Sequence, residues 1–101
     1  MVDLYSLLQE TGMPVAYHHF KEKQTPPYLV YMFDESDNYE ADNKTYHAIN
    51  HYKVELYTVI KSPLIEGSVE ALFDANEIIY EKLEAYIESE DLYQVFYDIT
   101  I

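Results

Sequence analysis

A long alternating segment, TYHAINHYKVELYTVIK at residues 45–61, most constrains how this chain can fold. Its even-numbered positions, from Tyr46 to Ile60, are mostly apolar, and its odd-numbered positions are mostly polar. Because successive side chains of a strand point to opposite faces of a sheet, the pattern predicts a half-buried antiparallel strand. Its first sixteen residues, 45–60, at roughly 3.3 Å each would extend about 50 Å, more than twice a usual strand. The segment therefore bends, or its first half projects.

The residues before this strand favour projection. DESDNYEADNK, residues 34–44, is acidic and polar, and it follows YLVYMF, residues 28–33, which predicts a strand with two apolar faces. We therefore expect a projecting β-hairpin arm over residues 34–52. Its polar tip would stay in solvent, while tyrosines would offer contact area to a neighbouring molecule. The predicted interface residues are Tyr31, Tyr39, Tyr46, Tyr52, Asp42 and Lys44.

Two helices and further strands complete the predicted domain. The segment DLYSLLQETG predicts a short helix with Asp3 as its N-cap. The segments VAYHHF and LYQVFYDITI each predict a strand. The periodicity of residues 78–89 fits either a helix or a strand. Ser62 and Pro63 begin an amphipathic helix. Its predicted acidic outer face comprises Glu66, Glu70, Asp74 and Glu77. We expect one α+β domain, residues 1–101, with a mainly antiparallel sheet and two helices packed on one face.

Charge excludes several classes of partner. The chain has 101 residues, of which nineteen are acids and six are lysines, so its formal net charge is −13. DNA backbones and anionic membranes attract clustered cations, and the chain has one close pair, Lys21 and Lys23. No apolar run approaches the length of a membrane span, and the first residues do not predict a secretion signal. Zero cysteines exclude disulfides and fit a reducing cytoplasm.

Histidines and acids are numerous, but they do not predict a metal site or a catalytic site. On a strand, His47 and His51 would lie about 13 Å apart, too far to share an ion. Adjacent His18 and His19 would point to opposite faces of their strand. No acid stands out in an apolar setting, and the chain contains no phosphate-binding glycine loop and no nucleophile motif. We expect no enzyme activity, no cofactor and no metal.

The order of the elements resembles that of small tail completion, or tail terminator, proteins of long-tailed bacteriophages. The resemblance spans about Tyr5 to Ile101 and includes PPYLVY, ADNKTYHAINHYKVELYT, the capped helix after KSP, and YIESEDLYQVFYDI. It is strongest at these residues: Pro26, Pro27, Tyr28, Asp42, Asn43, Lys44, Tyr46, Glu55, Leu56, Tyr57, Glu88, Ser89 and Tyr93.

This resemblance implies a structural protein of the virion at the junction of tail and neck. It implies an α/β sandwich-like protomer that forms a homo-hexameric ring, ends tail-tube polymerisation and joins the tail to the capsid neck. The implied partners are other copies of the chain, the major tail tube protein and a neck or stopper protein, with assembly in the host bacterial cytoplasm. It also implies that residues 78–87 pair with 91–100 as a hairpin and that the second helix ends near Asn76.

DNA would pass through such a ring without specific binding. Six copies would carry 6 × −13, about −78 charges, and an anionic wall would not retain phosphates. The acids of the second helix listed above, or the stretch at residues 34–42, are candidates for the lumen; a solvated exterior face is the alternative. Two other functions fit the sequence. One is an acidic DNA mimic that inhibits a host DNA-binding protein, and the other is a stopper or adaptor of the same neck.

Overall fold

The computed structural model describes residues 3–41 and 44–101, with side chains described outside residues 36–49. The elements in chain order are α1 (Leu4–Gln9), β1 (Val15–Tyr17), β2 (Tyr28–Ala41), β3 (Lys44–Thr58), α2 (Pro63–Ala75), β4 (Ile79–Ile87), the 3-10 turn η1 (Glu88–Glu90) and β5 (Leu92–Thr100). The strands form one sheet in the order β1-β2-β3-β5-β4. Since β1 pairs with β2 in parallel and the other neighbours are antiparallel, the predicted α+β class is confirmed.

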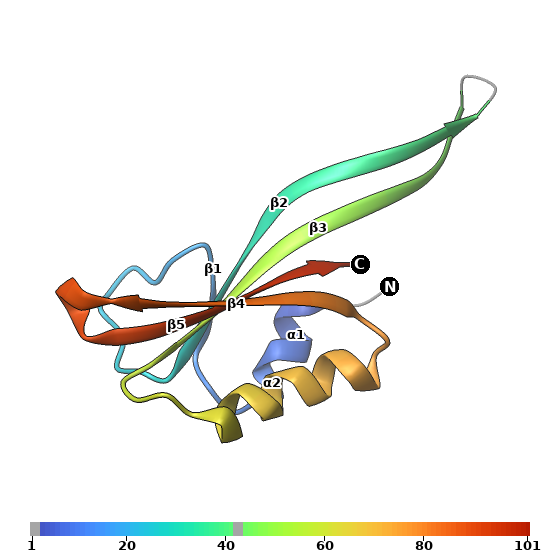
Figure 1. Ribbon diagram of the computed structural model, residues 1–101. Coiled ribbons are helices and arrows are strands. Elements are labelled where there is room, and N and C mark those ends of the chain that lie inside the picture. Colours follow the sequence, from blue (N-terminus) through green and yellow to red (C-terminus); the bar gives the residue numbers. More distant parts are fainter. Residues whose placement is uncertain (1–2, 42–43) are drawn as a thin grey trace.

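Both helices lie on the same face of the sheet, as Figure 1 shows. The register places alternate residues of neighbouring strands side by side on that face, with Leu29 opposite Leu56 and Leu56 opposite Val95. The helices add their apolar stripes to these strands. The resulting core consists of Leu4, Leu7, Leu8, Leu29, Val54, Leu56, Val69, Phe73, Ile78, Val95, Tyr97 and Ile99.

Side-chain caps determine where the helices begin. The carboxylate of Asp3 accepts a hydrogen bond from the Ser6 backbone N–H at 3.4 Å, and the Ser62 hydroxyl accepts one from the Ile65 N–H at 3.3 Å. Each cap pairs an N–H group that lacks a partner within its helix. The helix α2 ends at Ala75 with Asn76 as its C-cap, near the position that the resemblance implied. The predicted N-caps are therefore confirmed.

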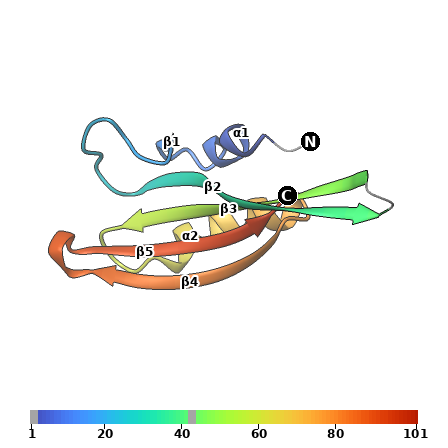
Figure 2. The same cartoon turned by 90° about the horizontal axis from the view of Figure 1, so that it is seen from above.

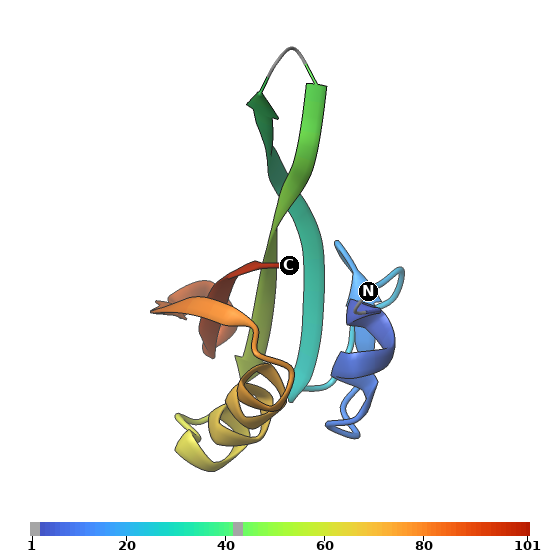
Figure 3. The same cartoon turned by 90° about the vertical axis from the view of Figure 1, so that its right-hand side faces the viewer.

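The hairpin of β2 and β3 extends beyond the rest of the sheet, as Figures 1 and 3 show. Its pairing runs from Tyr28 opposite Tyr57 to Ala41 opposite Lys44. The chain end accompanies β3 only as far as Asn50, whose backbone exchanges hydrogen bonds with Ile101. Within the described chain, residues 37–41 and 44–49 pair with each other alone; we call them the arm. The predicted projecting hairpin is confirmed, with a shorter free part.

The segment after α2 forms a strand, which settles the ambiguity of its periodicity. Pairing runs from Ile79 opposite Thr100 to Ile87 opposite Leu92, so β4 and β5 form the implied hairpin. Its turn is η1 followed by Asp91, whose φ of 51° is left-handed. Figure 2 shows β4 at one margin of the sheet and β1 at the other.

The predicted strand VAYHHF is wrong beyond its first half, because β1 ends at Tyr17. The next residue, His18, has a φ of 67°, which turns the chain out of the extended conformation. Its N–H still donates a hydrogen bond to the Tyr31 carbonyl at 2.7 Å. The chain then forms a loop that ends at the cis peptide between Pro26 and Pro27.

Candidate interaction surfaces

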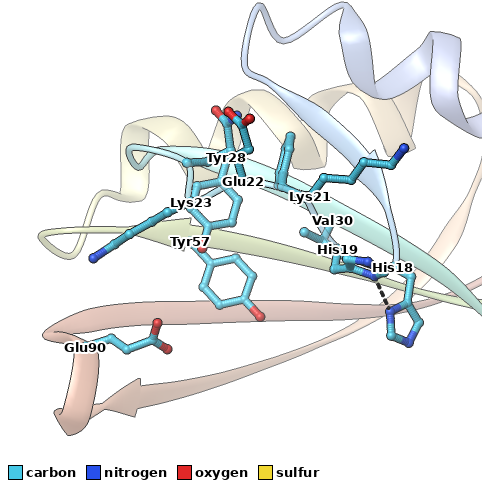
Figure 4. A pocket seen from close by; sticks show the side chains of 11 residues that line it. His18, His19, Lys21, Glu22, Lys23, Tyr28, Val30, Tyr57 and Glu90 are labelled. Atoms are coloured by element: carbon cyan, nitrogen blue, oxygen red, sulfur yellow. Dashed lines mark hydrogen bonds between the residues drawn. The ribbon is translucent and has the colours of Figure 1, made fainter.

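The two adjacent histidines lie together, contrary to the prediction that they point to opposite faces. The Nδ1 atoms of His18 and His19 are 3.0 Å apart and share a hydrogen bond, drawn in Figure 4. The left-handed backbone of His18 explains the error, because the alternation of a strand no longer applies there. Both rings are exposed at the margin of a shallow cavity of about 300 Å³. The pair supplies two nitrogens, fewer than a protein zinc site uses.

Stacked tyrosines form the floor of this cavity. The rings of Tyr28 and Tyr57 are 4.9 Å apart and nearly parallel, and Phe20 contacts Tyr28 edge-on. The Tyr57 hydroxyl donates to Glu55 at 2.9 Å and accepts from Gln94 at 3.0 Å. Burial, and then the bond to Glu55, raises the pKa of Tyr57 above its usual value. This phenol stays protonated at neutral pH and acts in packing and hydrogen bonding.

The predicted interface tyrosines divide into two groups. Tyr31 and Tyr52 line one hollow beside α1, where Tyr31 contacts Tyr17 edge-on at 5.1 Å and Tyr52 contacts Phe33 at 5.5 Å. Both rings are partly buried against the core, so they have a structural role within the protomer and keep part of their surface accessible. The side chains of Tyr39, Tyr46 and Lys44, and the whole of Asp42, lie outside the described residues.

A cluster of ion pairs joins α2 to β4. The carboxylate of Glu66, only 3% exposed, lies 2.7 Å from Lys61 and 2.7 Å from Lys82. Lys82 also contacts Glu70 at 2.8 Å, and Lys61 contacts Glu84. Glu70 in turn accepts a hydrogen bond from the hydroxyl of buried Tyr97 at 2.8 Å. The cluster ties the helix to the edge strand through one buried carboxylate, Glu66, and lysines that remain partly exposed to water.

The prediction that Glu66 lies on the outer face of the helix is wrong, because Glu66 is buried. Glu70, predicted on the same outer face, is half-buried. Glu66 precedes Val69 by three residues and Phe73 by seven, a spacing that places it on the inner apolar stripe. That spacing in the sequence could have indicated that Glu66 is buried. It could not identify Lys61 and Lys82, whose charges compensate the buried carboxylate. Glu66 cannot line a channel, and Glu70 contacts the sheet.

Asp74 and Glu77 are exposed near the end of α2, as the outer-face prediction requires. Glu77 follows the helix with a φ of 56°, which turns the chain toward β4. Neither carboxylate forms a salt bridge with any lysine or histidine side chain that the structure describes. They remain the two candidates for an anionic surface on this helix.

The sheet face opposite the helices carries one continuous row of paired residues. Val30, Glu55, Phe96 and Leu83 are neighbours across β2, β3, β5 and β4. Within the described chain no helix packs on this face. Leu83 is 51% exposed and Ile79, on the same face of β4, is 77% exposed. This face therefore ends at β4 in two accessible aliphatic side chains, Leu83 and Ile79, which sequence periodicity alone did not single out.

An acidic hollow lies where the arm leaves the sheet. It is lined by Asp34, Glu35, Glu81 and Asp98 together with His51. One carboxylate oxygen of Asp98 is buried and has no hydrogen-bond partner in the described structure. No cluster of three or more histidine or carboxylate side chains that could hold a metal ion occurs among the side chains that the structure describes, those of residues 3–35 and 50–101. The hollow is a concentrated negative surface at the base of the arm.

In the part of the chain that the structure describes, no helix combines the length and apolar character needed to span a bilayer. Comparison of the sequence with models of known protein families and with curated proteins finds no match.

Proposed function

We propose that this protein is a structural virion protein of a long-tailed bacteriophage, a tail terminator or tail completion protein. In this role it forms a homo-hexameric ring that ends tail-tube polymerisation and joins the tail to the capsid neck. The support from sequence is the resemblance over about Tyr5 to Ile101. The structural observation that carries the proposal is the arm, because a ribbon that leaves its own sheet presents surfaces that a neighbouring subunit can complete.

The charge of the chain agrees with passage of DNA through the ring. At a net charge of −13 per copy, the wall repels phosphates and offers no cationic groove to hold them. The exposed acids of α2, Asp74 and Glu77, are the proposed lumen residues. In particles carrying Asp74→Lys with Glu77→Lys, we expect slower DNA ejection and normal assembly. Unchanged ejection kinetics would place these acids on the exterior.

The decisive experiment is native mass spectrometry of the purified protein, alone and mixed with the major tail tube protein of the same phage. We expect a six-copy ring in at least the mixed sample, and rings capping the tube ends under negative stain. A monomer or dimer that does not bind tubes would contradict the proposal. Rings that bind portal or neck proteins and leave tubes uncapped would instead identify a stopper or an adaptor.

The net charge favours one function of a different class, an acidic DNA mimic. A mimic presents acids spaced like phosphates to a basic protein, and the acidic hollow beside the arm is the described surface that comes nearest to this. A pulldown from host lysate tests it. Recovery of a nuclease or repressor at low salt, with loss at high salt, would favour the mimic, whereas tube-end capping would exclude it.

A further inference from the structure

The outer edge of β4 is an unpaired sheet edge in the described structure. In the described structure β4 pairs with β5 on one side and is the last strand of the sheet on the other. Its nine residues therefore present a row of backbone N–H and C=O groups to solvent, a template for a strand from another molecule. Proteins usually keep exposed edge strands short, cover them with another element, or place charged side chains on them.

The side chains of β4 leave this edge accessible. Ile79 is 77% exposed and Leu83 is 51% exposed, so the strand carries apolar surface that a neighbouring strand would cover. A lysine often guards an exposed edge, but Lys82 is held over the helix-covered face by Glu66 at 2.7 Å and Glu70 at 2.8 Å. The ion-pair cluster thus removes the one cation of β4 from a guarding position, which leaves the exposed carboxylate of Glu81 as the charge on the open face of the strand.

The two strands of the arm also lack a neighbouring strand on their outer edges in the described chain. Its two strands, residues 37–41 and 44–49, pair with each other and with no third strand in the described chain. A two-stranded ribbon is marginally stable in water, and a third strand or a packed layer is what stabilises it. Figure 1 shows that the arm leaves the sheet along the direction of its strands, while β4 lies two strands away from β3 in the sheet order. The arm cannot pair with β4 of its own copy while β2 and β3 stay paired.

We infer that the arm of one copy adds to the outer edge of β4 in a second copy, forming a sheet that continues from one protomer into the next. The strand lengths match, because five or six arm residues fit along nine edge residues. The contact joins two different patches and is therefore heterologous, so its repetition produces a closed ring or a filament. This inference rests on the proposed function in one respect, that the repeated contact closes.

Site-specific photocrosslinking tests the contact. Leu83 on β4 and Leu64 at the start of α2 are each replaced by p-benzoylphenylalanine, and Leu64, 86% exposed, is the matched control away from the edge. Each variant is mixed with isotope-labelled copies and illuminated in the assembled state. We expect the Leu83 probe to capture the tryptic peptides 24–44 or 45–53 of a labelled copy, and the Leu64 probe to capture neither.

Two results would overturn the inference. One is an assembly in which the Leu83 probe captures other segments, or in which both probes capture the arm equally. The other is a protein that stays monomeric in every mixture. Removal of residues 36–43 should abolish the Leu83 product. Tube capping tests the proposed function separately. Rings that cap tubes but lack this crosslink would support the proposed function and contradict the arm–β4 contact. Crosslinked filaments that do not bind tubes would support the contact and contradict the proposed function.

Discussion

At the scale of single residues, Glu66 is the most informative side chain. A carboxylate that is 3% exposed is costly to bury unless cations and hydrogen bonds compensate it, and here Lys61 and Lys82 both lie at 2.7 Å. Burial alone would raise the pKa of Glu66, but the hydrogen bonds from the two lysines outweigh it and hold that pKa below its usual value. Glu66 is therefore charged at neutral pH and part of what holds α2 against β4.

Replacing this carboxylate should destabilise the protomer. For Glu66→Gln we expect a loss of about 2 kcal/mol in the free energy of unfolding, since each of two ammonium groups loses one of its two carboxylate partners but keeps access to water. The measurement is urea denaturation followed by circular dichroism. Asp74→Asn, an exposed acid on the same helix, is the control and should change stability by less than about 0.5 kcal/mol. Equal effects of the two variants would contradict the assigned role.

The same group predicts a pH dependence. Because the pKa of Glu66 is lower in the folded than in the unfolded chain, its contribution is complete above the ordinary value of 4.5 and is lost as the pH falls through the lowered value. The difference in unfolding free energy between the wild type and Glu66→Gln should be constant near neutrality and shrink in acid. Denaturation series at several pH values measure it. A difference that grows in acid would refute the lowered pKa.

At the scale of elements, we expect folding and the proposed association to depend on different parts of the chain. The described core residues come from α1, α2, the inner parts of the strands and Ile78 between α2 and β4, and none of them lies in the arm. The helix α1 has six residues, too few to be stable alone, and depends on burying Leu4, Leu7 and Leu8. The backbone of the arm, by contrast, pairs with no third strand in the described structure. We therefore expect the core elements to stabilise the protomer and the arm to act in the proposed assembly.

Deleting residues 36–43 should leave the fold intact and abolish assembly. We expect the thermal unfolding midpoint of the protomer to change little, because the deletion removes no described core residue. Ring formation and head joining should be lost. Differential scanning calorimetry and native mass spectrometry of the same preparation measure the two effects. Rings of normal size from the shortened chain would show that the arm is dispensable for subunit contacts.

At the scale of the whole molecule, charge opposes association. The protomer measures 51 × 27 × 23 Å and carries a net charge of −13, so approaching copies repel one another. The inferred contact relies on backbone pairing and apolar cover, which salt does not weaken. Added salt shortens the screening length from about 10 Å at 0.1 M to about 3 Å at 1 M and reduces the repulsion.

Association of this protein should therefore strengthen with salt. At constant protein concentration, we expect the assembled fraction in sedimentation velocity to rise between about 50 mM and about 500 mM sodium chloride. An assembly that dissolves in this range would show that ion pairs hold the copies together. It would favour a charge-driven contact such as that between the acidic hollow and lysines of another copy.

Local patterns by themselves determined most of the fold. Alternation at residues 45–60 predicted a strand and its buried face, and Asp3, Ser62 and Pro63 predicted where helices begin, because caps and strand periodicity act between residues close in sequence. The polar stretch at residues 34–44 likewise predicted a projecting hairpin. Residues 78–87 stayed ambiguous until pairing with β5 was known, because their periodicity fits both states.

Only the tertiary structure decided which charges are buried and which edge is open. Glu66 is tolerable inside because Lys82 arrives from a strand sixteen positions later, and no local pattern in α2 contains that partner. His18 and His19 meet because a left-handed residue ends β1. The free edge of β4 exists because the sheet order places it last. The burial of Glu66 and the open edge depend on contacts between residues distant in sequence, and the histidine pair depends on a backbone conformation that strand periodicity does not predict.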